Sequence, residues 1–438
     1  MTRPPLAVAL GVALVALPAL AGCAASDSRS APNAPEPISN TASSISVAAA
    51  PAADRQKKGD PPRSTCYVDF LDIGTGLAVL VRCRDDSDRV LNILYDGGSN
   101  DPELRNKNRL IYLLDTGLGF APGSTIHHLF QSHAHFDHHS ELIRADGVIA
   151  KYDVKNIWDP ASINDTVAYG CFITSVIEKA NATNMVYHPA RKCPDFSKLF
   201  CDKVKMPAWK NEAASVRPFD APARDTPMTP PYAINLGFTG ITAKILHADP
   251  TRPEDKLNDS SLVLKLELFG VKLLLTGDEE AGRERKPPDK PPGAKSVEKF
   301  LIDNADLSAN IVQVPHHGSE TSSTDEMQNK TLLKYREKSD TFAVISSGPW
   351  KYSGTVLPDA TVVESWRNKV GRSHVLLTTL NDKDSPKCAK NKDKIAPMPA
   401  SDETPAGCNN IEFIIEDRAK GRKITSVAYW PIGPAVRL

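Results

Sequence analysis

The chain has 438 residues, of which 41% are hydrophobic and 24% are charged, a composition that excludes a chain disordered throughout. Lys and Arg together number 53 and so do Asp and Glu, so no global charge draws the protein toward nucleic acid or an anionic membrane. Beyond the first thirty residues the sequence lacks an apolar run long enough to span a bilayer, which excludes a membrane-spanning helix in the mature chain.

The N-terminus is predicted to be an export signal. Arg3 precedes an apolar stretch over 6–20, and small residues follow it, the layout of a secretory signal peptide. The sequence Leu20-Ala21-Gly22-Cys23 resembles a bacterial lipobox, which implies removal of residues 1–22 and lipidation of Cys23. An ordinary signal peptide with a chance cysteine is the alternative.

The next forty residues are predicted to be a tether. Residues 23–63 are rich in Ala, Ser, Pro and Asn and hold few large apolar side chains, so they are expected to form a disordered linker. The folded domain is then predicted to cover 64–438. Because Ala24 rather than Asp follows the cysteine, the resemblance favours an exported protein held by lipid at the outer membrane, facing the periplasm, or at the cell surface.

Cysteine usage agrees with export, because no pair has the CxxC spacing of a structural zinc site and an oxidising periplasm favours disulfides. Cys66 and Cys83 flank a predicted strand pair and Cys388 and Cys408 bracket a polar loop, so each pair is able to close. Three cysteines remain, Cys171, Cys193 and Cys201. They can form one disulfide and leave one thiol free. The sequence does not fix the pairing.

The most informative segment is the HxHxDH pattern His133-Ala134-His135-Phe136-Asp137-His138. Strand-like residues 125–131 precede it, and 141–149 could be helical, so the pattern is expected on a loop at a strand end. Imidazole nitrogens and a carboxylate at this density suit a transition metal, and four ligands are enough to serve two neighbouring ions. A histidine-rich surface loop without metal is the alternative.

Two further segments place polar side chains at strand ends. Residues 262–269 and 271–275 are apolar, β-rich runs separated by Phe-Gly, and they predict adjacent strands. Asp278 falls just past the second run. A short strand over 311–314 ends at Pro315, so His316 and His317 are also delivered at a strand end.

In chain order these segments resemble the motifs of metallo-β-lactamase-fold hydrolases, and among them the soluble domain of ComEC-type DNA-uptake proteins. The matching segments are Phe70–Ala78, Leu94–Ser99, the HxHxDH loop, Asn258–Leu264, Leu273–Asp278 and Val314–Ser319. The resemblance implies an αββα fold of two mixed sheets flanked by helices. It also implies two divalent transition-metal ions, zinc or else manganese.

By the same resemblance the metal ligands are His133, His135, Asp137, His138, Asp278 and His316. Asp278 bridges the two ions and His316 is favoured over His317 for the second. Asp137 and Asp278 are the catalytic residues, since Asp137 can also orient or accept a proton from the attacking water. Asp96 is expected to hold a ligand histidine in its tautomer. The third ligand of the first ion is left open between His247 and Asp259.

The sequence also departs from the family pattern. Gly74-Thr75-Gly76-Leu77-Ala78 lacks the two polar residues of the usual GQGDA, Ser140-Glu141 stands where Gly-Gly is common, and Leu357-Pro358 replaces His-Pro. These changes leave metal binding expected and weaken the inference about substrate.

The predicted function is metal-dependent hydrolysis, with a phosphodiester or nucleic acid as the substrate by resemblance. A basic, proline-rich loop over 283–295 could steer phosphate or could be a solvated surface excursion. A β-lactam or lactone hydrolase is one alternative, although the sequence offers no identifiable cationic anchor for a carboxylate. A non-catalytic, metal-binding envelope lipoprotein is the other. Beyond the lipid anchor, the sequence indicates no specific protein partner.

Overall fold

The computed structural model describes residues 64–101, 108–164, 166–190, 207–223, 231–251, 254–282, 284–335, 338–348, 351–352, 354–378, 409–418, 423–431 and 436–437. The predicted signal peptide, the linker and the Cys388–Cys408 pair therefore lie outside the described residues. Among the residues described, no helix is long and apolar enough to cross a bilayer.

The larger sheet has nine strands in the order β22-β21-β20-β1-β2-β3-β5-β7-β8. In chain order these are β1 (Thr65–Phe70), β2 (Gly76–Arg84), β3 (Val90–Ser99), β5 (His128–Phe130), β7 (Asn156–Asp159), β8 (Val186–Pro189), β20 (Asn409–Glu416), β21 (Ile424–Pro431) and β22 (Val436–Arg437). The strands from β3 to β8 are parallel and the others pair antiparallel, so the sheet is mixed.

The second sheet has seven strands in the order β19-β16-β13-β12-β11-β10-β9. They are β9 (Tyr232–Ile234), β10 (Ile241–His247), β11 (Val263–Leu268), β12 (Val271–Leu275), β13 (Ile311–Gln313), β16 (Phe342–Ile345) and β19 (Val375–Leu377). The predicted hairpin is confirmed: β11 and β12 pair antiparallel, and Phe269 and Gly270 turn the chain with φ of 51° and 88°. The predicted strand at 311–314 is confirmed as β13.

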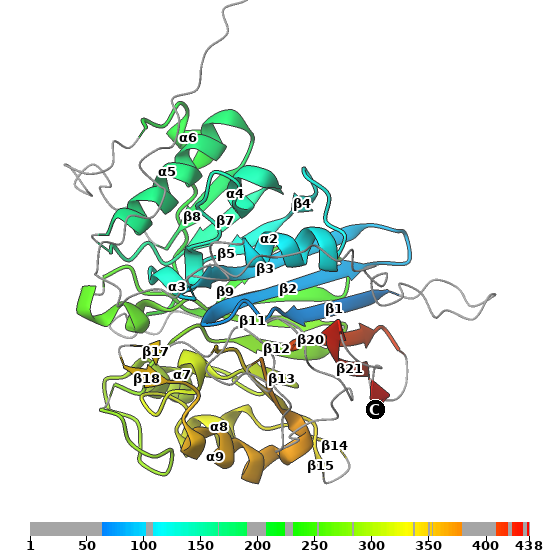
Figure 1. Cartoon of the computed structure of the whole chain (residues 1–438), viewed down its shortest axis with the longest axis vertical. Helices are drawn as coiled ribbons and strands as arrows, with labels where there is room; N and C mark the ends of the chain where they lie inside the picture. Colours follow the sequence, from blue (N-terminus) through cyan, green and yellow to red (C-terminus); the bar gives the residue numbers. More distant parts are fainter. Residues whose placement is uncertain are drawn as a thin grey trace, which may run out of the picture.

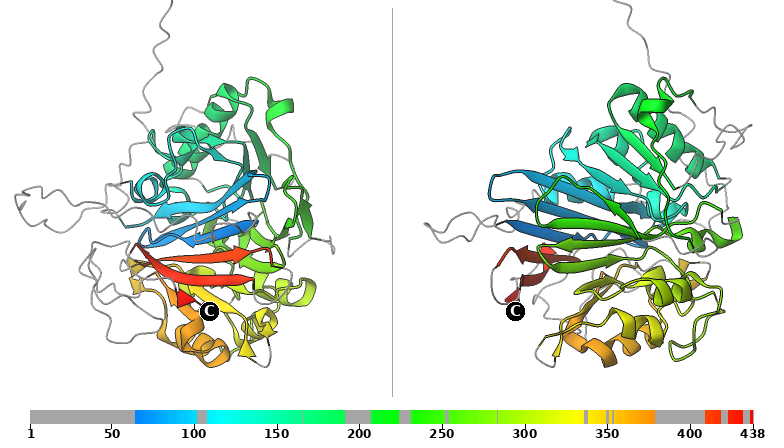
Figure 2. Two further views of the ribbon diagram at one scale, coloured as in Figure 1. Left: turned by 90° about the vertical axis from the view of Figure 1, so that its right-hand side faces the viewer. Right: turned by 180° about the vertical axis from the view of Figure 1, so that it is seen from behind.

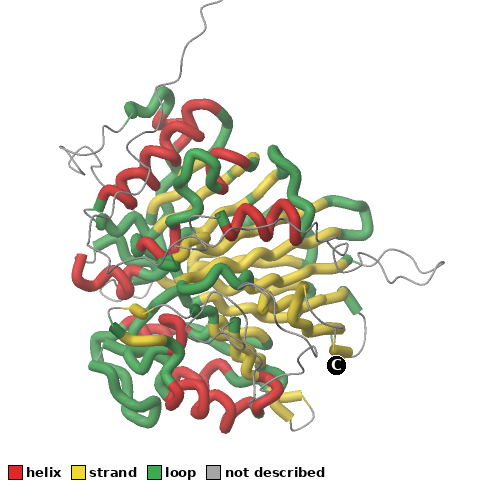
Figure 3. Tube along the Cα trace, viewed as in Figure 1, coloured by secondary structure: helices red, strands yellow, loops and turns green. Residues whose placement is uncertain are grey.

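Helices cover the outer face of each sheet (Figures 1 and 3). On the larger sheet lie α2 (Arg109–Tyr112), η1 (Leu113–Gly117), α3 (Phe136–His139), α4 (Val148–Lys151) and α5 (Val167–Ala182). On the second lie α7 (Val297–Asn304), α8 (Asp325–Thr331) and α9 (Ala360–Val370). The shorter helices are α6 (Glu212–Ser215), η3 (Glu254–Ser260), η4 (Pro315–Gly318) and η5 (Arg372–His374), and the two-residue strand pairs are β4 (Thr125–Ile126) with β6 (Asp153–Val154), β14 (Lys334–Tyr335) with β15 (Lys338–Ser339) and β17 (Lys351–Tyr352) with β18 (Thr355–Val356).

Three apolar cores hold these layers together. Along β2, Leu77, Val79 and Val81 belong to the core between the sheets, whereas Ala78 and Leu80 belong to the core under the helices. This alternation is what a strand buried on both faces requires, because successive side chains point to opposite faces. A third core joins α7, α8 and α9 to the second sheet. The two sheets pack face to face (Figure 2), so the predicted αββα sandwich is confirmed.

One predicted helix does not form. Of residues 141–149, only Val148 and Ile149 are helical, as the start of α4. The chain instead folds into tight turns, with the Val148 amide donating to the Glu141 carbonyl. A Cβ at Gly147 would lie 2.7 Å from that carbonyl oxygen, so only glycine allows this closure.

The disulfide between Cys66 and Cys83 joins β1 to β2, one of the pairs that the sequence left possible. Cys171 is disulfide-bonded as well.

Candidate metal centre

Strand ends from both sheets meet at one edge of the sandwich. In the larger sheet β5 ends at Phe130, and the loop that follows carries His133 and His135 into α3. In the second sheet β12 and β13 are parallel, so their carboxyl ends deliver Asp278 and the Pro315–Gly318 turn to the same edge. Residues far apart in the sequence are thereby brought together, for example His138 and Asp278, which are 140 positions apart.

Two glycines allow the loops to approach this closely. A Cβ at Gly98 would lie 2.4 Å from the His139 amide nitrogen, so β3 can touch the backbone of α3 only with glycine there. Gly277 has a φ of 58°, and a Cβ there would lie 2.8 Å from the Ser132 Cβ. The first contact seats the HxHxDH loop, and the second seats Asp278 beside it.

The carboxylate of Asp278 is the centre of the cluster. Its Oδ2 lies 3.1 Å from His138 Nε2, 3.3 Å from His317 Nε2 and 3.9 Å from His133 Nε2. All four side chains are almost fully buried. One carboxylate oxygen therefore faces three imidazole nitrogens.

Asp137 lies on the same side as His138 and His317. Its Oδ2 is 3.4 Å from His317 Nε2 and 3.8 Å from His138 Nε2. One ligand atom from each of Asp137, His138, Asp278 and His317 lies within 4.8 Å of the other three. This spacing is compatible with ligands around a single ion at the usual bond lengths of about 2 Å.

His133 and His135 form the other half of the cluster. The Nε2 of His133 lies 2.8 Å from the Nδ1 of His135; His133 is buried and His135 is partly buried. Burial, together with neighbouring histidines, lowers the pKa of His133 well below its usual value, and burial also lowers that of His135. Both are therefore neutral near pH 7, the form in which an imidazole binds a metal.

Asp96 sits behind His138. Its Oδ2 accepts a hydrogen bond of 2.8 Å from His138 Nδ1, and its Oδ1 accepts one of 2.6 Å from the Ser132 amide. This contact leaves the Nε2 of His138 directed at Asp278 and Asp137. This pairing fixes both the tautomer and the orientation of the ring.

Of the two adjacent histidines, His317 lies in the group of four with Asp137, His138 and Asp278, and His316, which the sequence favoured, does not. The His317 Nδ1 donates to the Ser346 carbonyl at 2.8 Å, which aims its Nε2 at Asp137 and Asp278. The His316 Nδ1 lies 2.7 Å from Thr321 Oγ1 and 3.1 Å from Glu280 Oε1. Both residues have positive φ, 49° and 53°, so the turn swings their side chains to different sides.

Neither candidate for a further ligand of the first ion belongs to the group of Asp137, His138, Asp278 and His317. His247 directs its Nδ1 to the Ser261 carbonyl at 2.9 Å and packs its ring against Phe300. Asp259 is buried in η3, outside the group of four. The replacements at Ser140 and Glu141 have structural partners: Ser140 bonds the Ser99 backbone, and Glu141 accepts from the Leu110 amide at 2.6 Å.

The charges of the cluster depend on one another. Burial by itself would lower the pKa of His317, but Asp278 and Asp137 outweigh it and raise that pKa to about 9. Burial would raise the pKa of Asp278, yet His138 and His317 hold it well below its usual value. Carboxylates and imidazoles are thus held in mutual attraction at the bottom of the site.

The donor set fits a divalent transition metal. Among the described residues, Asp278 Oδ1 is buried without a hydrogen-bond partner, and His317 Nε2 has only its longer contacts with Asp278 and Asp137. Such an arrangement costs free energy unless another group satisfies these atoms. Imidazole nitrogen combined with carboxylate oxygen is a set that zinc and manganese accept. The cluster could therefore hold a metal ion, and its members are the residues that would bind it.

Sequence reasoning missed Tyr352, on the β17–β18 hairpin. Its ring stacks on His317, with centroids 4.7 Å apart and planes 20° apart. Its hydroxyl is buried and makes no hydrogen bond within the described part of the chain. Burial and then Asp137 and Asp278 raise its pKa well above 10, so it remains a neutral donor facing the cluster. No local motif marks this residue.

No model of a known protein family matches the chain, and no curated protein does either. Among solved structures, the chain is similar to the metallo-beta-lactamase fold protein YhfI from Bacillus subtilis, with 11% sequence identity and a TM-score of 0.31. The similarity covers 72% of this chain and 95% of that one. At these values it supports no inference about function.

Proposed function

We propose that the protein is a metal-dependent hydrolase that uses two divalent cations, zinc or manganese, to cleave phosphodiester bonds in nucleic acid. The observation that carries the proposal is the gathering of buried histidines and carboxylates around Asp278 Oδ2. A structural metal site needs only one closed set of four ligands, and this cluster has residues for more.

The cluster divides into two sets that share Asp278. His133 and His135 would hold the first ion with Asp278, and Asp137, His138 and His317 would hold the second with it. Two such cations would supply charge that polarises the scissile bond and activates water. Asp96 would keep His138 oriented, and Asp137 is placed to accept a proton near the attacking water.

The preference for an anionic substrate has two supports. One is the order of sequence motifs, which resembles that of the DNA-uptake proteins. The other is the basic, proline-rich loop, which packs beside the Pro315–Gly318 turn: Arg285 lies 3.4 Å from Ser319 Oγ, and the Lys286 amide donates to the Glu320 carbonyl. Arg285 also pairs with Asp359, so its charge is partly neutralised.

The test combines elemental analysis with a substrate panel. Purified protein should contain zinc, manganese or iron, about two ions per chain, and should lose activity with chelator and recover it with added metal. The panel is single-stranded DNA, double-stranded DNA, bis-nitrophenyl phosphate and a chromogenic β-lactam. Protein that contains no such metal and takes none up would overturn the metal centre.

The panel also separates the competing functions. Turnover of the β-lactam alone would replace the phosphodiesterase proposal with a lactam or lactone hydrolase. A metal-loaded protein that turns over no member of the panel would favour a non-catalytic envelope lipoprotein.

The proposal includes a location outside the cytoplasm, with the chain lipidated at Cys23. The Cys66–Cys83 disulfide supports it, because disulfides persist in oxidising compartments. Cys23→Ser should move the protein from the membrane to the soluble fraction and abolish incorporation of labelled fatty acid. A Cys23→Ser protein that stays with the membrane, together with an unlabelled wild type, would contradict this location.

A further inference from the structure

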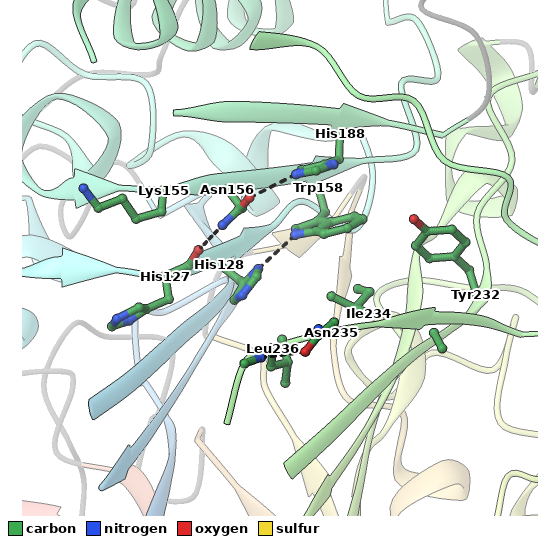
Figure 4. A pocket seen from close by; sticks show the side chains of 12 residues that line it. His127, His128, Lys155, Asn156, Trp158, His188, Tyr232, Ile234, Asn235 and Leu236 are labelled. Carbon is green, nitrogen blue, oxygen red and sulfur yellow. Dashed lines mark hydrogen bonds between the residues drawn. The ribbon is translucent and has the colours of Figure 1, made fainter. Parts of the chain in front are cut away.

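A second cavity lies away from the metal centre, where β5, β7 and β8 of the larger sheet face β9 of the second sheet (Figure 4). Its volume is about 490 Å³, within the range of small-molecule sites. Its wall includes His128, Trp158, His188, Tyr232 and Asn235. None of these residues belongs to the metal cluster.

The aromatic wall of this cavity is held rigidly. Trp158 stacks on His188, with centroids 3.9 Å apart and planes 7° apart, and on Phe130 at 5.9 Å. The Trp158 indole donates to His128 Nδ1 at 3.2 Å. His188 is held in turn by Asn156, whose Oδ1 lies 3.0 Å from His188 Nε2. A ligand would therefore meet rings already in position, which lowers the entropy cost of binding.

The wall offers hydrogen-bonding groups without net charge. Because His128 Nδ1 accepts from Trp158, its remaining proton is on Nε2. The Tyr232 hydroxyl and the Asn235 amide can both donate and accept. Lys155, at the rim, pairs with Asp153 at 2.7 Å. The described residues that line the cavity carry no carboxylate, so a cation finds no partner there.

This chemistry favours a flat heterocycle. A sugar ring, rich in hydroxyl donors, would gain most from carboxylate acceptors, and this lining has none. A nucleobase presents neutral donors and acceptors on its edge and π-faces that stack on Tyr, Trp or His rings. The half-buried rings of His188 and Tyr232 offer faces for stacking, and His128 and Asn235 offer polar groups for the edge of the base.

The position of the cavity agrees with a polymeric substrate. His128 begins β5 and His133 follows its end, five residues later, so their backbones are separated by no more than ~18 Å. At ~3.4 Å of rise per stacked nucleotide, that distance corresponds to only a few nucleotides. We propose that this cavity binds one base of a nucleic-acid strand whose phosphodiester is cleaved at the metal centre, an assignment that rests on the proposed function.

The test measures binding and hydrolysis separately. Chelator-treated protein, which cannot hydrolyse, is titrated calorimetrically with adenosine, cytidine and N-acetylglucosamine, and with a short single-stranded DNA and its abasic counterpart of equal length. The variants are His188→Ala and Tyr232→Ala. Tyr112→Ala, at a tyrosine that is 49% exposed on α2, is the matched control, and Asp278→Asn reports on the metal centre.

We expect the nucleosides to bind, and His188→Ala and Tyr232→Ala to weaken them and the DNA by roughly 10-fold or more, the usual loss of one stacking contact. Tyr112→Ala and Asp278→Asn should leave nucleoside affinity unchanged, and the abasic strand should bind no better to wild type than to the pocket variants.

Failure of either idea is visible separately. Nucleosides that do not bind, that bind equally to the pocket variants, or that bind no better than N-acetylglucosamine would overturn the base pocket even if phosphodiesters are cleaved. If nucleosides bind at the pocket but no phosphodiester is cleaved, the proposed function fails, the cavity remains a nucleobase site, and its link to cleavage is lost.

Discussion

Two groups of histidines lie in different surroundings, one where the loops after β5 and β13 meet and the other on β5 and β8 of the larger sheet. His138 and His317 face Asp137 and Asp278, whereas His128 and His188 lie in an aromatic stack, and the described residues that line their cavity include no carboxylate. The pKa of His317 is raised to about 9, while burial lowers that of His188 to about 4. The neighbouring carboxylates, more than the imidazoles themselves, decide whether such a group is suited to a metal or to a neutral ligand.

The largest expected effect comes from removing the central carboxylate. Asp278→Asn keeps the size of the side chain but removes the charge that faces three histidines. The rate on any true substrate should fall by at least ~100-fold, a barrier increase of ~2.7 kcal/mol. Circular dichroism should be unchanged, and Asp86→Asn, at an exposed residue far from the cluster in the sequence, should keep the full rate. An Asp278→Asn protein with the wild-type rate would show that the cluster is not the catalytic centre.

A third environment sharpens the comparison, because Asp159 is buried among tyrosines instead of histidines. It accepts hydrogen bonds from Tyr187 at 2.7 Å and Tyr169 at 3.3 Å, and burial raises its pKa to about 6. Folding favours the protonated carboxyl of Asp159. Its contribution to the free energy of unfolding is therefore fully present below the unfolded pKa of ~3.9 and is lost as the pH rises through 6.

The stability of wild type relative to Asp159→Asn should therefore fall by about 2 kcal/mol between pH 4 and pH 7.5. Urea unfolding across this range measures the difference, with Asp86→Asn, at an exposed turn, as the control that should show no such trend. A pH-independent difference for Asp159→Asn would mean that folding does not shift the pKa of Asp159.

The unpaired hydroxyl of Tyr352 gives a smaller effect at the metal end. The Tyr352 ring stacks on His317, and its buried hydroxyl has no hydrogen-bond partner among the described residues. The hydroxyl can therefore donate a hydrogen bond to a substrate oxygen. Tyr352→Phe should lower kcat by roughly 10-fold, the value of one hydrogen bond to a charged group, and leave metal content unchanged. A loss of metal instead would show that the ring only supports His317.

Sequence motifs and apolar runs predicted those site residues that lie within one continuous segment of the chain. The HxHxDH loop and Asp278 follow strands whose apolar runs are visible in the sequence, so their delivery to one edge was predictable. The choice between His316 and His317 was not, because it depends on two consecutive residues with positive φ. The pocket around Trp158 joins three strands and β9, and no sequence period connects them.

The smallest expected effect concerns the imidazoles of His128 and His188 in the pocket, which should not become protonated between pH 8 and pH 5. Burial, with His127 and His188 nearby, lowers the pKa of His128 to about 3, and burial lowers that of His188 to about 4. Both folded values lie below the usual ~6.5, so both rings stay neutral above pH 5, and stability is lost only as pH falls from 6.5 toward 4. NMR of the imidazole nitrogens should show neutral rings from pH 8 to pH 5, with nucleoside affinity constant over that range. Protonation of either ring near pH 6.5 would give the cavity a positive charge, and its ligand would then be an anion.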